Sequence, residues 1–195
     1  MSMANTTPDA LSAREREILL RVAREAIAAA VGGNPPPVLD IEKQPPSLQA
    51  DGASFVTLTR DGRLRGCIGT MEPYQPLLAD VQEHAAAAAV SDFRFSKVTK
   101  DELEHIQIEI SRLTPLKELP YDSTEDLTRA LRAGVDGVLI NAGGRRATFL
   151  PQVWEQLQQP EEFLSHLCQK MGAPANLWKT QKMDVYTYQV EKFSE

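Results

Sequence analysis

The chain is poor in cysteine, histidine and aromatic residues, and it has no long apolar run. Its two cysteines, Cys67 and Cys168, lie roughly a hundred residues apart, so they form neither a disulfide framework nor a CxxC metal motif. Two unpaired thiols are typical of a reducing compartment. No apolar stretch approaches the ~20 residues of a membrane-spanning helix. We therefore expect a cytoplasmic protein with no membrane partner.

Positive charge is also scarce. The 21 Lys and Arg residues are outnumbered by 27 Asp and Glu residues, which gives a formal net charge of -6 at pH 7. Nucleic-acid-binding proteins usually carry a basic excess, so we expect no nucleic-acid partner. The histidines, His84, His105 and His166, follow no metal-binding spacing such as HExxH. We expect no metal site, and we place these histidines on surfaces or helix sides.

The chain does contain the pattern of a single domain of helices and strands. Apolar residues at helical spacing predict helices at residues 12–31, 77–90, 123–133 and 161–171. Alternating patterns predict strands at residues 55–59, 63–70, 106–113, 138–141, 146–150 and 184–193. Residues 93–95 are expected to be extended, and Trp178 is expected in a loop. This order favours an α+β fold with a mixed, largely antiparallel sheet flanked by helices. Residues 1–11 are expected to form a disordered tail.

The hairpin at residues 55–70 holds the most unusual stretch. Asp61-Gly62 is a strong two-residue turn signal between its strands. Gly66 and Gly69 flank Cys67 in the second strand, where glycine weakens pairing and offers nothing to pack. The two glycines indicate a β-bulge, or a place where a ligand or another backbone approaches closely.

Two interpretations of Cys67 follow. As a nucleophile, it would be activated by Arg65, which shares its face in a regular strand, while backbone N–H groups at Gly66 and Gly69 would bind an anion. Glu109, on the polar face of the strand at residues 106–113, is a candidate base. The alternative is a small buried hydrophobe, as free cysteine often is.

A second candidate feature is an anion clamp centred on Arg65. Arginine binds carboxylate and phosphate groups with two parallel hydrogen bonds. Together with Arg63, Arg94 and Arg112, it would make a local basic pocket in an acidic protein. The alternative is an ordinary solvated strand face. Cys168 is expected to pack on the core side of a helix.

The segment Leu64-Arg-Gly-Cys-Ile-Gly-Thr70 resembles the signature of the AMMECR-type domain family. Further segments agree with the family in the same order: 92–95, 106–114, 135–137, 150–153 and 161–174. Phe93 and Ser96 depart from it, because proline is common at both positions. The resemblance covers roughly residues 12–193 and implies a single domain with a larger and a smaller lobe. The candidate binding residues around Cys67 are Arg65, Gly66, Ile68, Gly69 and Arg94.

The same resemblance implies a component of an AmmeMemoRadiSam system, with a Memo-type protein and a radical-SAM protein as partners. It leaves the reaction, the substrate, the cofactor and the oligomeric state open. Two hypotheses therefore stand. In the first, the chain is an enzyme that uses Cys67, Arg65 and the glycine backbone on a small anionic or carbonyl substrate. In the second, it is a non-catalytic adaptor whose glycine-lined groove binds a partner protein or peptide.

Overall fold

The computed structural model describes residues 10–195, which divide into two compact units. Unit 1 contains residues 10–114 together with Glu191–Glu195, and unit 2 contains Pro115–Val190. The tail expected at residues 1–11 falls largely outside the described residues. Leu11, at its end, is buried, and its N–H donates to the Glu191 carboxylate.

Helix α1 (Ala13–Val31) begins and ends where its sequence signals lie. The Ser12 side chain accepts a hydrogen bond from the N–H of Glu15, and the Glu15 carboxylate accepts from the N–H of Ser12. This capping box satisfies two N–H groups that the first turn leaves without partners. At the other end Gly33 adopts a positive φ of 72°, which only glycine adopts readily, and the helix stops.

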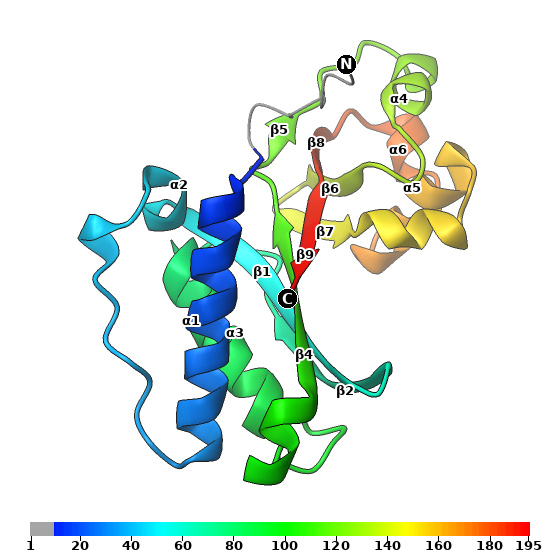
Figure 1. The fold of residues 1–195 in the computed structure, drawn as a ribbon. Coiled ribbons are helices and arrows are strands. Elements are labelled where there is room, and N and C mark those ends of the chain that lie inside the picture. The colour runs from blue at the N-terminus through cyan, green and yellow to red at the C-terminus, as the bar shows by residue number, and fades with distance from the viewer. Residues whose placement is uncertain (1–9) are drawn as a thin grey trace, which may run out of the picture. The chain divides into compact units, whose positions relative to one another are not determined.

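The sheet of unit 1 has the strand order β2-β1-β4-β9, and the short strand β3 (Gln75–Pro76) pairs with β1. Its strands are β1 (Asp51–Arg60), β2 (Arg63–Gly69), β4 (Ile106–Leu113) and β9 (Val190–Ser194). Helices α1 and α3 (Leu77–Val90) pack against each other on one face of this sheet (Figure 1). Apolar side chains of the helices and of that face form one core, whose largest fully buried members include Leu19, Ile27, Leu58, Leu78, Ile108 and Ile110. We call this the inner face, and the opposite one the outer face.

The β1–β2 hairpin contains a register shift that changes the face on which Cys67 lies. Leu64 pairs with Thr59, but Gly66 pairs with Leu58, so Arg65 has no partner on β1. A β-bulge of this kind inserts one extra residue into a strand. Without it, the two-residue turn would pair Cys67 with a core residue of β1. With it, Cys67 pairs with Thr57 on the outer face.

Unit 2 is built on a second antiparallel sheet, in the order β5-β8-β6-β7. Its strands are β5 (Lys117–Glu118), β6 (Gly137–Ala142), β7 (Arg145–Phe149) and β8 (Asp184–Tyr188). Helices α4 (Thr124–Ala130) and α5 (Pro160–Lys170) complete the unit with a separate core. The Phe163 ring stacks on Trp154 in that core, with ring centroids 3.8 Å apart.

The remaining helical elements are short: η1 (Ile41–Lys43), α2 (Pro46–Gln49), η2 (Lys100–His105), η3 (Pro151–Glu155) and α6 (Leu177–Thr180). Among the described residues, no helix has both the length and the apolarity that crossing a membrane requires. The expected fold class is confirmed: the molecule is α+β, with antiparallel sheets flanked by helices.

Several local expectations were wrong. The strand predicted at residues 184–193 is two strands, β8 and β9, which belong to different sheets. Their alternation is the same on both sides of Gln189, so the pattern gives no sign of the break. Trp178 lies in α6 and not in a loop, and its buried indole N–H donates to Ser165 Oγ (3.1 Å). A buried indole N–H usually finds a hydrogen-bond partner, and Ser165 on α5 supplies it here.

Two further boundaries differ from the expectation. Residues 93–95 form a turn and not an extended segment, because the N–H of Phe95 donates to the carbonyl of Asp92 (3.1 Å). Helix α4 ends at Ala130 and not at residue 133. The N–H of Arg132 donates to the Asp136 carboxylate (2.9 Å) instead of a helical carbonyl.

Candidate functional site

Cys67 lies on β2, at the edge of the unit 1 sheet, and its backbone is bound by a side-chain pair. The N–H of Cys67 donates to Asp92 Oδ2 (2.8 Å), and the carbonyl of Cys67 accepts from Arg94 Nη2 (3.2 Å). Both groups would otherwise face solvent, because β2 has a strand neighbour on one side only. Asp92 and Arg94 therefore bind the edge strand much as a neighbouring strand would.

Asp92 and Arg94 also bind each other tightly. Arg94 donates to the carboxylate of Asp92 through Nε (2.9 Å) and Nη2 (2.7 Å), which is the bidentate geometry of a strong pair. The side chain of Asp92 is buried, while that of Arg94 is 45% exposed. The hydrogen bonds from Arg94, and then the N–H of Cys67, hold the pKa of Asp92 far below its ordinary value. Asp92 is thus a fixed negative charge.

The thiol itself contacts Thr57. Cys67 Sγ lies 3.2 Å from Thr57 Oγ1, and the two residues face each other across β2 and β1. Glu109 on β4 is the next residue in the same row, because it pairs with Thr57 from the other side. Neighbouring strands are about 4.8 Å apart, so Glu109 starts roughly 10 Å from Cys67. Thr57 lies between the predicted nucleophile and the predicted base.

Arg65 has a different environment from the one expected. It occupies the bulge, so the regular alternation that would place it beside Cys67 is interrupted. Its guanidinium donates to Glu102 through Nε (2.9 Å) and Nη2 (3.0 Å), and to the carbonyls of Ser96 (2.7 Å) and Lys97 (3.1 Å). An external anion would have to compete with Glu102 for this guanidinium.

Three of the four arginines named as a basic pocket pair with different carboxylates, and the fourth, Arg63, is exposed at the start of β2. Arg65 binds Glu102, Arg94 binds Asp92, and Arg112 on β4 binds Glu191 (3.3 Å). Of these three, Arg94 has the most exposed side chain, at 45% against 14% for Arg65 and 10% for Arg112, and it also binds the carbonyl of Cys67. It is therefore the one best able to receive an anion near Cys67.

The two glycines are explained by contacts within the chain. A Cβ on Gly66 would overlap the carbonyl oxygen of Ala88 in α3, and a Cβ on Gly69 would lie 2.5 Å from the Phe55 ring. Both expected alternatives, a bulge and a close backbone approach, are found at Gly66. Ile68 lies on the inner face opposite Val56, where it packs against the core.

Sequence reasoning missed Asp92 and Thr57 as parts of the site. Asp92 was noticed in the family pattern, two residues before Arg94, but its bond to Cys67 spans 25 residues and leaves no local signal. Thr57 was hidden by the bulge, because a regular hairpin gives Cys67 a different partner. The usable signal for the bulge was the pair of glycines in a strand.

Within residues 10–195, the side chains form no group of three or more His, Cys, Asp or Glu that would hold a metal ion. His84 is buried in α3, where its Nδ1 lies 3.3 Å from Asp80 Oδ2, and Ser54 donates to the same oxygen (2.6 Å). His105 and His166 are exposed, as expected.

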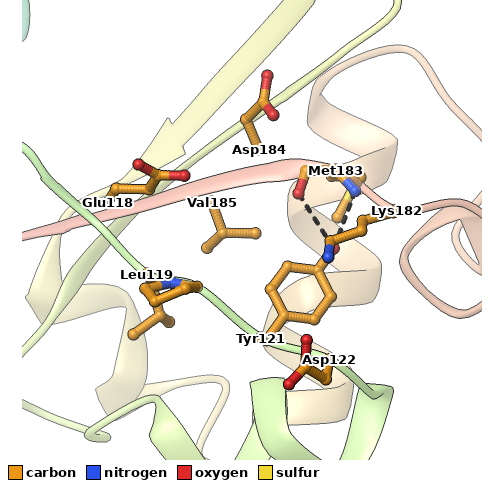
Figure 2. Close-up of a pocket in the computed structure, with 9 residues that line it drawn as sticks. Glu118, Leu119, Tyr121, Asp122, Lys182, Met183, Asp184 and Val185 are labelled. Carbon is orange, nitrogen blue, oxygen red and sulfur yellow. Dashed lines mark hydrogen bonds between the residues drawn. The ribbon is translucent and has the colours of Figure 1, made fainter.

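Unit 2 has a cavity of about 390 Å³ beside β5 and β8 (Figure 2). Its aromatic wall is Tyr121, whose hydroxyl donates to the carbonyl of Met183 (3.1 Å) and accepts from the N–H of the same residue (2.8 Å). Lys182 Nζ lies 5.7 Å from the centre of the Tyr121 ring. None of the residues that the sequence singled out lines this cavity.

Comparison with known proteins places the chain in a family. The family model described as AMMECR1 matches residues 20–193. A protein of Methanopyrus kandleri is 36% identical over 195 residues, with 95% of this chain and 90% of the relative aligned. A protein of Methanothermobacter thermautotrophicus is 37% identical over 191 residues, with 95% of this chain and 96% of the relative aligned.

A solved structure agrees with the fold. The crystal structure of an uncharacterized protein from Pyrococcus horikoshii has a TM-score of 0.68 and 33% identity, covering 92% of this chain and 90% of that one. The match of the family model spans both units and includes the whole Cys67 site. This chain is therefore a member of the AMMECR1 family.

Proposed function

We propose that the chain is a thiol enzyme in which Cys67 attacks a small substrate with an anionic or carbonyl group. The observation that carries this proposal is the binding of the Cys67 backbone by Asp92 and Arg94. It holds a partly exposed thiol in one place on an edge strand, where backbone groups usually face water. A nucleophile needs such fixed geometry to meet its substrate.

Arg94 is proposed as the group that receives the anionic part of the substrate. One of its nitrogens binds the carbonyl of Cys67, so its charge lies within a few ångströms of the reacting residue. The hydrogen bonds with Asp92 raise the pKa of Arg94 further, so it stays protonated. The thiolate is the nucleophilic form of a cysteine. We assign Arg65 a structural role, because its guanidinium already forms an ion pair with Glu102.

Glu109 remains the proposed base. Its carboxylate is 43% exposed and lies 3.9 Å from Lys192 Nζ. Because Thr57 separates it from Cys67, any proton passing from the thiol to Glu109 must cross the Thr57 hydroxyl or a water molecule. Gly66, Ile68 and Gly69 contribute the shape of the strand rather than direct contacts with the substrate.

The test compares two alkylating agents on the unmodified protein. Iodoacetamide is neutral and iodoacetate carries a carboxylate. We expect Cys67 to react with iodoacetamide at least about tenfold faster than free cysteine at pH 7. We also expect the ratio of the iodoacetate rate to the iodoacetamide rate to be higher for Cys67 than for free cysteine. Arg94→Gln should remove the preference for iodoacetate, whereas Arg94→Lys should keep part of it.

Cys168 is the internal control for this experiment. It is fully buried in unit 2, and burial raises the pKa of its thiol, so it should react only when that unit opens. The proposal fails if Cys67 reacts no faster than free cysteine with either reagent. Peptide mapping by mass spectrometry separates the two sites.

A second candidate function is an adaptor, favoured by exposed apolar side chains near the motif. Phe93 is 95% exposed between Asp92 and Arg94, and Leu64 lies exposed on β2. On this proposal a Memo-type protein and a radical-SAM protein in the cytoplasm are the partners, as the resemblance implies. A slow Cys67, together with co-purification that Phe93→Asp abolishes, would favour the adaptor over the enzyme.

A further inference from the structure

The Thr57 hydroxyl is the only described group besides Asp92 and Arg94 that makes a polar contact with Cys67, and it is the one that touches the sulfur. Oγ1 and Sγ lie 3.2 Å apart, within hydrogen-bonding range for sulfur. A hydroxyl is a good donor, a thiol is a weak donor, and a thiolate is a good acceptor. The contact is therefore strongest when Thr57 donates and the sulfur carries a negative charge.

Three features of the fold hold this contact in place. The N–H and carbonyl of Cys67 point to Asp92 and Arg94, away from β1, so the Thr57–Cys67 pair is of the non-hydrogen-bonded kind, in which side chains come closest. The bulge at Arg65 supplies the register that pairs the two residues. Threonine is branched at Cβ, so its χ1 rotates little and its hydroxyl stays in place.

The charged groups around the pair are few among the described residues. Asp92 and Arg94 approach from the segment after α3, and Arg65 lies two residues away on β2, bound to Glu102. Across the sheet, Glu109 on β4 faces Lys192 on β9. From α3, the neighbour of β2 at this point is the uncharged Ala88. Among these neighbours, Thr57 is the one whose hydroxyl lies within hydrogen-bonding distance of the Cys67 sulfur.

We infer that Thr57 is a positioning residue that donates a hydrogen bond to the Cys67 thiolate and so sets its orientation and reactivity. This inference rests on the proposed function, because it concerns the same thiol. Thr57 acts through Cys67 and need not touch the substrate. When the thiolate attacks a carbonyl carbon, a sulfur lone pair forms the C–S bond and the π electron pair of the C=O bond moves to the carbonyl oxygen. The Thr57 hydroxyl keeps its proton and, released from the sulfur, donates to water or to the next group in the row.

The experiment measures the rate of Cys67 alkylation by iodoacetamide between pH 5 and 10, in the full chain. Thr57→Val has nearly the same shape without the hydroxyl, and Thr57→Ser keeps the hydroxyl. Thr59→Val is the matched control, because Thr59 lies two residues along the same strand on the same face and pairs with Leu64. The unfolding free energy and the protection of Cys168 are recorded for each variant.

We expect Thr57→Val to lower the rate at pH 7 by about tenfold and to move the pH profile about one unit upward, the effect of removing a hydrogen bond to a charged group. At high pH, where the thiolate forms in both proteins, the rates should converge. Thr57→Ser should restore most of the rate, and Thr59→Val should leave the profile unchanged. Packing alone would give the valine variant the profile of the unmodified protein.

The inference is overturned if Thr57→Val and Thr59→Val give the same pH profile. Failure of the proposed function looks different: Cys67 in the unmodified protein would then react no faster than free cysteine. A slow Cys67 whose profile still depends on Thr57 would support the hydrogen bond and reject the enzyme. If Thr57→Val fails to fold, Thr57→Ala and Thr57→Ser supply the same comparison.

Discussion

At the scale of single residues, the site is arranged around two ion pairs with separate roles. Asp92 and Arg94 bind the backbone of Cys67, while Glu102 and Arg65 join β2 to η2 and to residues 96–97. Both carboxylates accept two-pronged hydrogen bonds from arginine, and both have a lowered pKa. The Asp92–Arg94 pair fixes the backbone of Cys67, and the Glu102–Arg65 pair holds the bulge of β2 against η2.

Glu102 gives a prediction about pH. The hydrogen bonds from Arg65 lower the pKa of Glu102 to about 2, from an ordinary value of 4.5. Because the folded state prefers the ionised form, the stabilisation is fully present above pH 4.5 and is lost as the pH falls through 2. We expect Glu102→Gln to cost about 2 kcal/mol at pH 7, allowing for screening near the surface.

The measurement is the unfolding free energy of both proteins in urea from pH 7 to pH 2.5. The difference between them should narrow as the pH falls from 4.5 toward 2. Glu104→Gln is the matched control, since Glu104 is exposed on the same short helix. A difference that stays constant over this range would show that the Glu102 charge contributes nothing.

At the scale of elements, the decisive contact joins β2 to α3. Gly66 lies on the inner face and meets the carbonyl of Ala88, near the end of the helix. Asp92 follows that helix directly, so the contact that brings α3 against β2 also brings Asp92 to Cys67. The requirement for glycine at position 66 and the binding of Cys67 by Asp92 thus depend on the same packing of α3 against β2.

Gly66→Ala tests this arrangement. An added Cβ would overlap the Ala88 oxygen, which belongs to backbone and cannot rotate away. We expect a loss of about 2–3 kcal/mol in unfolding free energy, the range for overpacking in a core. Leu64→Ala, at an exposed position on the same strand, should cost far less. Equal stability of Gly66→Ala and the unmodified chain would contradict the packing described.

At the scale of the whole molecule, the chain builds two units, each with its own core and its own sheet. The chain enters unit 2 at Pro115 and re-enters unit 1 at Glu191, so β9 completes the first sheet. The residues proposed for chemistry, Cys67, Thr57, Asp92, Arg94 and Glu109, all belong to unit 1.

Phe163→Ala tests how separately the two cores respond. Phe163 is fully buried in unit 2, stacked on Trp154 and edge-on to Phe149. Its truncation should cost about 3–5 kcal/mol within that unit. We expect hydrogen exchange to speed up in β6, β7 and α5 and to change little in β1 and β4. Leu19→Ala in α1 should give the reverse, and equal loss of protection in both units would show that they open together.

The sequence by itself determined the elements that local chemistry specifies. Helix α1 follows from its capping box and apolar stripe, β4 from strict alternation, and the first hairpin from Asp61-Gly62. Asp61 and Gly62 both have positive φ, as a tight turn between twisted strands requires. The motif around Cys67 also indicated the stretch that carries the proposed site. These signals lie within a few residues of the structure they predict.

Only the tertiary structure decided what surrounds the thiol. A one-residue bulge moved Cys67 from the core face to the outer face, because the side-chain period of a strand is two and any single insertion reverses it. Asp92 binds the N–H of Cys67 because α3 packs against β2. Arg65 forms an ion pair with Glu102, which lies in the later element η2. Likewise, the side-chain alternation of residues 184–193 is uniform, but the strands on either side of Gln189, β8 and β9, belong to different sheets. Each outcome depends on which distant segment supplies a partner, and that information is absent from local sequence.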